Sequence, residues 1–430
     1  MSADFCQILC AGDVHLGRRP SRVPVGDDDL SVRHVWERFI ETAINREVDV
    51  VVLTGDIVDS ENEMYEAFEA LERGVQRLLD GGIEIVAVAG NHDHDAFPRL
   101  VRGIDADGFH LLGPGGTWEE VQIGLESGET VRFVGWSFPQ ATVLSSPLGG
   151  LEVSESDEPT IGVLHCEAGS GEGQYAPVRR DALARTPIDA WLLGHIHAPN
   201  DHREAGQLQL YPGSLQPLDP GEPGTHGAWL IEVSGQDATA EQIPLASLRY
   251  EETGVDVSDC ETREDVEETV LRRLREGAAE LGEQFPDLRH VAHRLRFEGR
   301  TSLHREIEET LREMVGSVRR EVDQVAATIE DFTLQTRPDH DLGEMARADD
   351  PPGVLAQLLL KLENGEAEGE RIRRVLREAS KATREVHESS RYEPLRRDSE
   401  TREPPQREDL QAMLYQQGLL LLDELHASRD

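Results

Sequence analysis

Short apolar runs alternate with amphipathic segments through the first 250 residues of the chain. Three of these runs, 7–12, 48–55 and 83–90, each end in a glycine that is followed by a polar residue. The segments between them, 32–46 and 63–79, repeat apolar residues at the spacing of a helix with one buried face. Buried strands joined by such helices are typical of a parallel βαβ sheet.

Further strands are expected where short apolar blocks continue along the chain. These blocks are residues 131–136, 160–165, 190–194, 208–211 and 228–233. With the first three runs they provide enough strands for two sheets. The expected fold class is therefore α/β, with a two-sheet α/β sandwich over residues 1–250.

The pattern changes in the second half of the chain. A helical segment at 266–281 precedes a strand at 291–297, and a second helical segment at 303–318 precedes a strand at 327–334. Each helical segment has one apolar face. We therefore expect a small α+β domain over residues 251–336.

Residues 337–430 contain no convincing strand and are expected to form a helical tail. The expected helices are 354–362, 366–390 and 410–426, with a linker rich in proline and arginine before the last. The apolar stretches 355–362 and 419–422 have no evident core of their own. Two arrangements stay open: docking into the groove of a partner, or packing on the domain before the tail.

The charge of the chain is unusual for its length. The 430 residues include 84 acidic and 43 basic residues, a net charge of −41, and the only lysines are Lys361 and Lys381. This excludes a basic protein that coats nucleic acid or adsorbs to membranes. We interpret the charge as adaptation to a salt-rich cytoplasm, where the Debye length falls to about 3 Å at molar salt. An acidic chain that avoids nucleic acid is the alternative.

The cysteines and the hydropathy restrict the cellular setting. Cys6, Cys10, Cys166 and Cys260 form no CxxC pair, so we expect buried thiols rather than a zinc knuckle or a disulfide framework. Residues 1–12 lack a signal-peptide pattern, and no stretch approaches 18 apolar residues. We therefore expect a cytoplasmic protein with no membrane segment.

Five polar signatures stand where expected strands end. They are Asp13-Val14-His15, Gly55-Asp56-Ile57-Val58-Asp59, Gly90-Asn91-His92-Asp93, His165 and Gly194-His195-Ile196-His197. Side chains at the carboxyl ends of strands in an α/β fold can converge on one site. Two divalent ions about 3.5 to 4 Å apart need such carboxylate, amide and imidazole ligands, and Asp56 is the natural bridge. One signature alone is usually structural, but the ordered set indicates a dinuclear metal site.

This set resembles the calcineurin-like metallophosphoesterase superfamily, whose pattern is DxH, GDxxD, GNHD/E, H and GHxH. The resemblance covers residues 13–197 and implies two divalent ions, with Mn²⁺ expected. It implies that Asp13, His15 and His197 hold one ion, that Asn91, His165 and His195 hold the other, and that Asp56 is shared. It also implies in-line attack on phosphorus by water activated between the ions. His92 would stabilise the phosphoryl oxygens or protonate the leaving oxygen, and a structural role is its alternative.

A second resemblance narrows the class of phosphoester. Residues 211–215, YPGSL, and 226–233, HGAWLIEV, are similar to the segment that closes the nuclease domain of SbcD-type DNA-repair exonucleases, with His226 at a lysine position. In that family a small capping domain follows, and then helices that bind the base of a coiled-coil ATPase; residues 251–336 and 353–430 have this size and order. The resemblance implies a homodimeric 3′ to 5′ exonuclease and single-strand endonuclease that acts on DNA ends in double-strand-break repair. Its partner would be an SMC-like ATPase of the SbcC type.

One position departs from the SbcD-type pattern. Asp59 stands where that family commonly has histidine, and in phosphatases of the superfamily the equivalent aspartate orients the histidine of GNH. Asp59 and His92 would then form a catalytic dyad. A metallophosphatase or nucleotide hydrolase is therefore the second hypothesis. A non-catalytic scaffold that regulates the ATPase is the third, and the intact set of ligand positions argues against it.

DNA contacts are expected from a few basic residues, because phosphate contacts position a duplex without reading its sequence. The candidates in the first domain are Arg18, Arg19, Arg22, Arg33, Arg179 and Arg180. In the tail, Arg373, Arg377, Lys381 and Arg384 recur at spacings that place them on one helix face, which would touch DNA or an acidic partner. For both groups the alternative is solvated side chains, which in the tail would pair with neighbouring glutamates.

Overall fold

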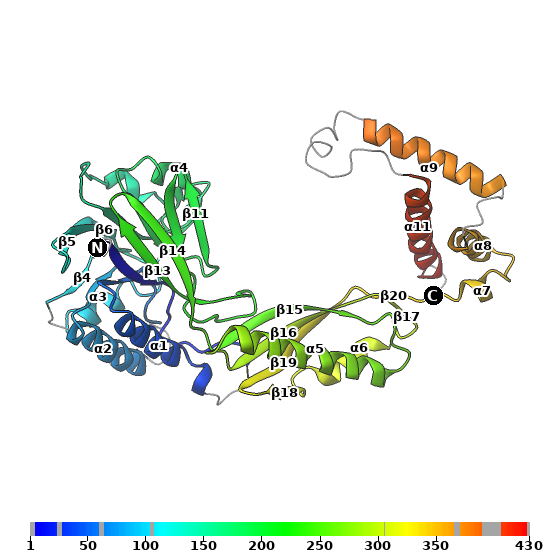
Figure 1. Ribbon diagram of the computed structural model, residues 1–430, viewed down its shortest axis with the longest axis horizontal. Coiled ribbons are helices and arrows are strands. Elements are labelled where there is room, and N and C mark those ends of the chain that lie inside the picture. Colours follow the sequence, from blue (N-terminus) through cyan, green and yellow to red (C-terminus); the bar gives the residue numbers. More distant parts are fainter. Residues whose placement is uncertain are drawn as a thin grey trace. The chain divides into compact units, whose positions relative to one another are not determined.

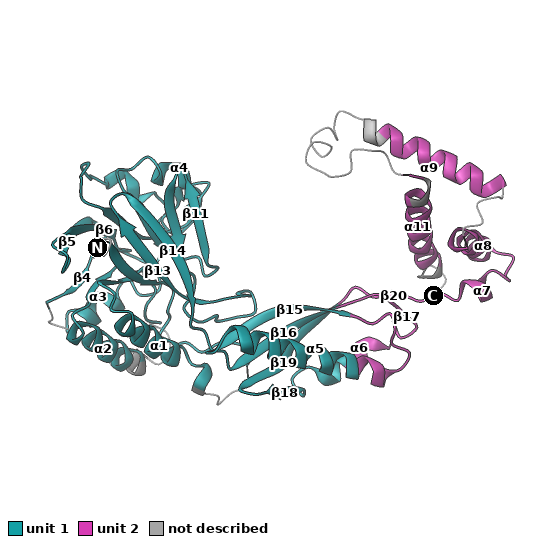
Figure 2. Ribbon diagram, in the orientation of Figure 1, with its two compact units in different colours: residues 1–255, 268–296, 311–333 teal, residues 256–267, 297–310, 334–430 magenta. Residues whose placement is uncertain are grey.

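The computed structural model describes residues 5–23, 28–59, 64–103, 107–304, 306–364, 370–388 and 406–427. The chain divides into two compact units (Figure 2). The first contains residues 1–255, 268–296 and 311–333, and the second contains residues 256–267, 297–310 and 334–430. The division into three domains at residues 250 and 336 stays a prediction.

The first sheet of the first unit has the strand order β14-β13-β1-β2-β3-β4. Its strands are β1 (Cys6–Ala11), β2 (Val50–Leu53), β3 (Glu84–Ala87), β4 (Phe109–Leu111), β13 (Gly227–Ser234) and β14 (Asp237–Pro244). Strands β1 to β4 are parallel, and β13 and β14 continue the sheet as an antiparallel hairpin. Every residue of β2 is buried, because both faces of the sheet are covered.

The second sheet has the order β11-β12-β10-β7-β6-β5. Its strands are β5 (Trp118–Gly124), β6 (Thr130–Trp136), β7 (Thr160–His165), β10 (Ala190–Gly194), β11 (Asn200–Glu204) and β12 (Gln207–Tyr211). The four central strands are parallel, and β5 and β11 are antiparallel edges. The short elements β8 (Ala168–Gly169), β9 (Val178–Arg179), α4 (Arg180–Leu183) and η2 (Pro147–Gly150) lie in the connections of this sheet.

The sheets form two central layers, with helices on the outer face of the first (Figure 1). These helices are α1 (Val32–Asn45) and α2 (Met64–Asp80), and η1 (Asp28–Leu30) and α3 (Ala96–Val101) are shorter. Alternate residues of each strand serve the two faces: Leu9 and Val51 pack under the helices, while Ile8 and Val50 pack against the second sheet. The predicted two-sheet α/β sandwich is therefore confirmed.

A third sheet of order β15-β16-β19-β18 follows. It contains β15 (Leu248–Asp256), β16 (His290–Glu298), β18 (Arg319–Val322) and β19 (Val325–Leu334), with helices α5 (Arg263–Gln284) and α6 (Ile307–Met314). The predicted strands and helices are present. Helix α6 is shorter than predicted, and Gly316, the second residue after it, has a φ of 72°, the left-handed conformation that commonly ends helices.

The second unit contains the helical tail. Its elements are the paired strands β17 (Arg300–Thr301) and β20 (Arg337–Pro338) and the helices α7 (Leu342–Met345), α8 (Pro351–Glu363), α9 (Glu370–Glu388) and α11 (Arg407–Ala427). The linker prolines Pro394, Pro404 and Pro405 lie outside the described residues.

The two apolar stretches of the tail pack against each other. Ala356 and Leu359 of α8 meet Leu419 and Leu422 of α11 in a small core. The prediction that these stretches have no core of their own was wrong, because each helix supplies the apolar face that the other lacks.

The cysteine side chains and the apolar character of the helices were both subjects of sequence predictions. All four cysteines lie in described segments and are buried free thiols, as predicted. Of the helices in the described segments, none combines the length and the apolar character needed to cross a bilayer.

Candidate metal centre

The five sequence signatures meet where strands of the two stacked sheets end. Asp13 follows β1, Asp56 follows β2, and Asn91 follows β3 of the first sheet. His165 is the last residue of β7, and His195 directly follows β10 of the second sheet. The two sheets therefore contribute ligands of different chemistry to one place.

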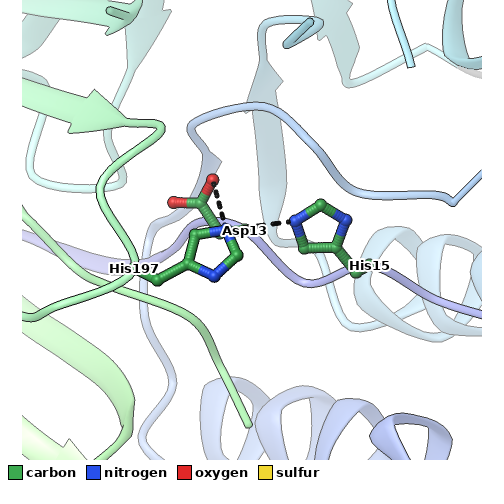
Figure 3. A group of neighbouring side chains, drawn as sticks. All are labelled: Asp13, His15 and His197. Atoms are coloured by element: carbon green, nitrogen blue, oxygen red, sulfur yellow. Dashed lines mark hydrogen bonds and ion pairs between the residues drawn. The ribbon is translucent and has the colours of Figure 1, made fainter. Parts of the chain in front are cut away.

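One group of possible metal ligands consists of Asp13, His15 and His197 (Figure 3). Each offers one ligand atom, and these atoms lie within 4.8 Å of one another. The Nε2 atoms of His15 and His197 are 3.3 Å apart, and Nε2 of His197 is 3.9 Å from Oδ1 of Asp13. Two imidazoles and one carboxylate suit a borderline divalent cation such as Mn²⁺ or Zn²⁺.

A second group consists of Asp13, Asp56 and His165. Nε2 of His165 lies 3.4 Å from Oδ2 of Asp56 and 3.0 Å from Oδ1 of Asn91. The same Asn91 oxygen is 3.2 Å from Nδ1 of His195. Sequence reasoning expected Asp56 as the shared residue, whereas Asp13 is the residue common to these two groups.

Unusual backbone conformations hold these side chains in place. Asp13, His15, Asp56 and His195 have φ values of 46°, 51°, 52° and 98°. Each such non-glycine conformation costs about 1 to 3 kcal/mol and persists only where the surrounding structure imposes it. At Gly90 a Cβ atom would collide with Oδ1 of Asp56. The glycine of GNHD is therefore required by the close approach of the two loops.

Asp93 links two of the ligand loops, a role that sequence reasoning did not assign. Its Oδ2 accepts hydrogen bonds from the backbone N–H groups of Ile57 (2.7 Å) and Val58 (3.4 Å), and its Oδ1 accepts one from Gly90 (2.7 Å). The side chain is fully buried. Asp93 therefore fixes the loop after β2 against the loop after β3, and the last letter of GNHD was its only sequence signal.

Glu222 was also missed, although it contacts a candidate ligand. Its Oε1 lies 2.8 Å from Nδ1 of His197. Its Oε2 accepts hydrogen bonds from the hydroxyl of Ser214 (2.7 Å) and the backbone N–H of Leu218 (3.0 Å). A carboxylate at Nδ1 keeps the proton on that nitrogen and directs the Nε2 lone pair at the metal.

The electrostatics of the centre favour a cation. Burial raises the pKa of Asp13 to about 6 and lowers the pKa of His15 to about 3. Burial opposes ionisation of Asp56 and His165 as well, but their mutual attraction dominates, so the pKa of Asp56 is lowered and that of His165 is raised. Nδ1 of His15 is buried without a hydrogen-bond partner among the described residues. Buried carboxylates beside imidazole nitrogens are the donor set that a pair of divalent ions requires.

The two predicted catalytic residues differ in exposure. His92 is exposed, its backbone N–H donates to Oδ1 of Asp56 (2.8 Å), and its ring centroid lies 5.3 Å from that of His15. Asp59 is 6 % exposed, and its backbone N–H donates to the carbonyl of Leu16 (2.9 Å). His92 is thus placed at the open edge of the centre, and its pairing with Asp59 stays a prediction.

The predicted DNA-contacting arginines of the first unit lie in different surroundings. Arg18 is near the centre, since its backbone N–H donates to the carbonyl of His15 (2.9 Å). Arg19, Arg22 and Arg33 are exposed. Arg179 forms an ion pair with Asp181 (2.8 Å), and the guanidinium of Arg180 lies 5.8 Å from the ring centroid of Tyr211.

The basic face of α9 is present as predicted from its spacing. Arg373, Arg377, Lys381 and Arg384 are exposed, and Lys381 pairs with Glu385 at 3.9 Å. Three of them, Arg373, Arg377 and Arg384, line a cavity of about 530 Å³ that Gln406 and Leu410 also line.

Comparison with known proteins agrees with the fold. Residues 6–199 match the family "Calcineurin-like phosphoesterase". These residues therefore form a calcineurin-like metallophosphoesterase domain, a class that implies a metal-dependent hydrolase with two divalent ions. Residues 250–337 match the family "Metallophosphoesterase YhaO, middle domain".

Individual relatives share only about a quarter of their aligned residues with this chain. The chain is 27 % identical over 256 residues to the uncharacterized metallophosphoesterase YhaO of Bacillus subtilis, covering 58 % of this chain and 61 % of the relative. It is 26 % identical over 265 residues to the DNA double-strand break repair protein Mre11 of Aeropyrum pernix, covering 59 % and 64 %. Each match thus spans less than two thirds of the relative. The solved structure of calcineurin-like phosphoesterase YfkN from Bacillus subtilis aligns with a TM-score of 0.37 at 14 % identity, covering 63 % of this chain and 96 % of that one.

Proposed function

We propose that the protein is a phosphodiesterase that cleaves DNA at its ends during double-strand-break repair, with Mn²⁺ as its metal. The observation that carries this proposal is the joining of two ligand groups through Asp13. Similarity to the Mre11 of Aeropyrum pernix supports DNA as the substrate. We extend the proposal to a 3′ to 5′ exonuclease that also cuts single strands, as the sequence resemblance implies.

Each ligand has a role in this proposal. Asp13, His15 and His197 would hold one ion, and Asn91, His165 and His195 the other, with Asp56 and Asp13 between them. Two divalent ions, when bound, supply Lewis acidity to the phosphoryl group and lower the pKa of water. Glu222 would fix the tautomer of His197, and the carbonyl of Thr54, 3.0 Å from Nδ1 of His165, would do the same for that residue.

His92 would act on the substrate. Because it is exposed beside His15, its imidazole can donate a hydrogen bond to a phosphoryl oxygen or a proton to the leaving oxygen. In this proposal Asp59 holds the His92 ring in position.

The proposal also includes the residues that contact DNA and the partner protein. Arg18, Arg19 and Arg22 would contact the backbone next to the centre, and Arg179 and Arg180 would contact it from the second sheet. The basic face of α9 would meet DNA or an SMC-like coiled-coil ATPase of the SbcC type, and the protein would act as a cytoplasmic homodimer.

The test offers the purified protein an end-labelled DNA duplex and a phosphomonoester, each with Mn²⁺ in molar KCl. Loss of the DNA label from one end, without hydrolysis of the monoester, is the expected result. Hydrolysis of the monoester alone would instead identify a phosphatase that uses Asp59 and His92. No hydrolysis of either, with an ATPase that co-purifies, would identify a scaffold.

Two variants assign the activity to the centre. Asp56→Asn is expected to abolish both Mn²⁺ binding and cleavage. His92→Ala is expected to keep Mn²⁺ affinity and the melting temperature while turnover falls at least about 100-fold. His110→Ala is the matched control, because His110 is a partly buried histidine that pairs with Glu84 (2.8 Å) on another strand. Full turnover in His92→Ala would refute its role.

A further inference from the structure

A cavity of about 390 Å³ lies in the first unit, between the loop after β1, the start of α1 and the helix α2. Leu16, Val32, Ala67 and Ala70 are its buried lining residues. Among the described residues that line it, the charged ones are Arg18, Arg19, Arg33, Arg73 and Glu69. Four positive and one negative side chains give a net of +3, which is unusual in a chain with a net charge of −41.

The cavity adjoins the metal centre through a rigid piece of backbone. Leu16 donates its N–H to the carbonyl of Ile57 (2.9 Å) and accepts the N–H of Asp59 (2.9 Å) at its own carbonyl. These bonds fix the cavity floor to the loop that carries Asp56. Gly17, which lines the cavity, is only two residues from the candidate ligand His15.

The start of α1 adds to the positive potential. Ser31 caps this 14-residue helix, and its hydroxyl accepts the backbone N–H of His34 (3.4 Å). The first turn of a helix carries a partial positive charge, which favours an anion near it. Arg33 stands in this first turn and lines the cavity together with Ser31 and Val32.

Arg73 closes the cavity from α2 and is available to an anion. It forms exposed ion pairs with Glu37 (3.3 Å) and with Glu69 (4.0 Å). Exposed pairs of this kind contribute about 0 to 1 kcal/mol, so a phosphate can replace them at little cost. Glu69, 78 % exposed in its side chain, is the one acid among the described lining residues and opposes anion binding.

We infer that this cavity binds a phosphate group of the nucleic-acid strand that is cleaved. This phosphate is a neighbour of the scissile phosphate on the same strand. The inference rests on the proposed function. A strand whose scissile phosphate lies at the metals carries further phosphates every 3.4 Å along the helix axis, so the adjoining cavity can receive one of them. Arg73 thereby adds to the DNA contacts that the sequence pattern suggested, among which Arg33 already stood.

Binding of a fluorescein-labelled single strand in EDTA tests the inference without catalysis. Arg33→Gln/Arg73→Gln is expected to raise the Kd at least about tenfold and to reduce the slope of log K against log salt by about 1. The matched control is Arg46→Gln/Arg77→Gln, since Arg46 caps the C-terminus of α1 and Arg77 on α2 pairs with Glu41 (3.9 Å), and neither arginine lines the cavity. Its Kd is expected within twofold of wild type. Glu69→Gln should tighten binding about two- to threefold.

The outcomes separate the inference from the proposed function. If the wild-type protein cleaves DNA but both double variants bind the strand alike, the cavity is not a phosphate site and the inference fails. If the wild-type protein neither binds nor cleaves DNA, the proposed function fails. Titration with inorganic phosphate then shows whether the cavity binds a small phosphate compound instead of a strand. Phosphate affinity that falls only in Arg33→Gln/Arg73→Gln would show a site for a small phosphate compound, which overturns the assignment to a strand.

Discussion

Glu222 allows a sharp test of how the centre is held together. In Glu222→Gln one terminal atom of the side chain is an acceptor oxygen and the other is a donor NH₂ group. One of them must face Leu218 and the other must face His197. The Leu218 N–H, 3.0 Å from Oε2, is a fixed donor and requires an acceptor. If the glutamine oxygen stays there, its NH₂ group faces Nδ1 of His197, 2.8 Å from Oε1 in the wild-type protein. Nδ1 must then accept, so the ring proton moves to Nε2, the atom that lies beside His15 and Asp13.

The opposite orientation of the glutamine has its own cost. Its oxygen would then face His197, and its NH₂ group would face the buried N–H of Leu218. A buried donor that is left without an acceptor costs about 1 to 3 kcal/mol. Either orientation therefore corresponds to a roughly 10- to 100-fold rise in the Kd for Mn²⁺. Glu222→Ala should weaken binding to a similar extent, because Nδ1 loses its acceptor.

Calorimetric titration of metal-free protein with Mn²⁺ measures this effect. Glu330→Gln is the matched control, since Glu330 is a buried glutamate of β19 that pairs with Arg294 (3.0 Å) away from the centre. Its Kd should equal that of wild type. Ser214→Ala removes one donor to Glu222 and leaves Leu218 in place, so it should change the Kd less than about threefold. Unchanged Mn²⁺ affinity in a folded Glu222→Gln protein would refute the argument.

Three further predictions concern stability. Asp93→Asn should lower the free energy of unfolding in urea by about 2 to 3 kcal/mol, because both carboxylate oxygens accept backbone N–H groups and an amide can satisfy only one side. A loss below about 0.5 kcal/mol would contradict the role of Asp93 in linking the two ligand loops. Mn²⁺ at 100 times its Kd should stabilise the protein by about 2.7 kcal/mol and raise its Tm, and Asp56→Asn should remove this gain. Burial lowers the pKa of His290 and His293 to about 4, so the unfolded chain binds more protons between pH 6.5 and 4, and stability should fall as pH falls through this window. His293→Gln should flatten that slope by up to about 1.4 kcal/mol per pH unit, and an unchanged slope would exclude a neutral buried histidine.

The central strands could be predicted because their own residues carry the signal. Each of the four residues of β2 is buried, so the strand reads as a continuous apolar run. The edge strands β5, β11 and β14 could not be found in this way. Glu119, Glu120 and Asp201 are exposed, and these segments become strands through pairing with a neighbour rather than through an apolar pattern.

The candidate site shows the same division. Ligands such as Asp56 and Asn91 come in the loops that follow the buried strands β2 and β3, so the order of motifs along the chain predicts that they meet. Glu222 lies 25 residues beyond His197, in a loop rich in proline and glycine. Its contact depends on the path of that loop between β12 and β13, which passes beside His197, and this path leaves no periodic signal. The core shared by α8 and α11 was missed for the same reason, because the pairing is not local.

A net charge of −41 disfavours a nucleic-acid substrate, but the arrangement of the arginines offsets this repulsion locally. Arg18, Arg19, Arg33 and Arg73 gather around one cavity beside the candidate ligands, so attraction for phosphate is local to the centre. A grip made of few phosphate contacts also releases few counterions, and its affinity therefore falls less steeply with salt than that of a broad basic surface. In the proposed function, local charge next to the candidate ligands would let an acidic protein hold DNA at high ionic strength. On that proposal, the acidity of the remaining surface would concern the solvent rather than the substrate.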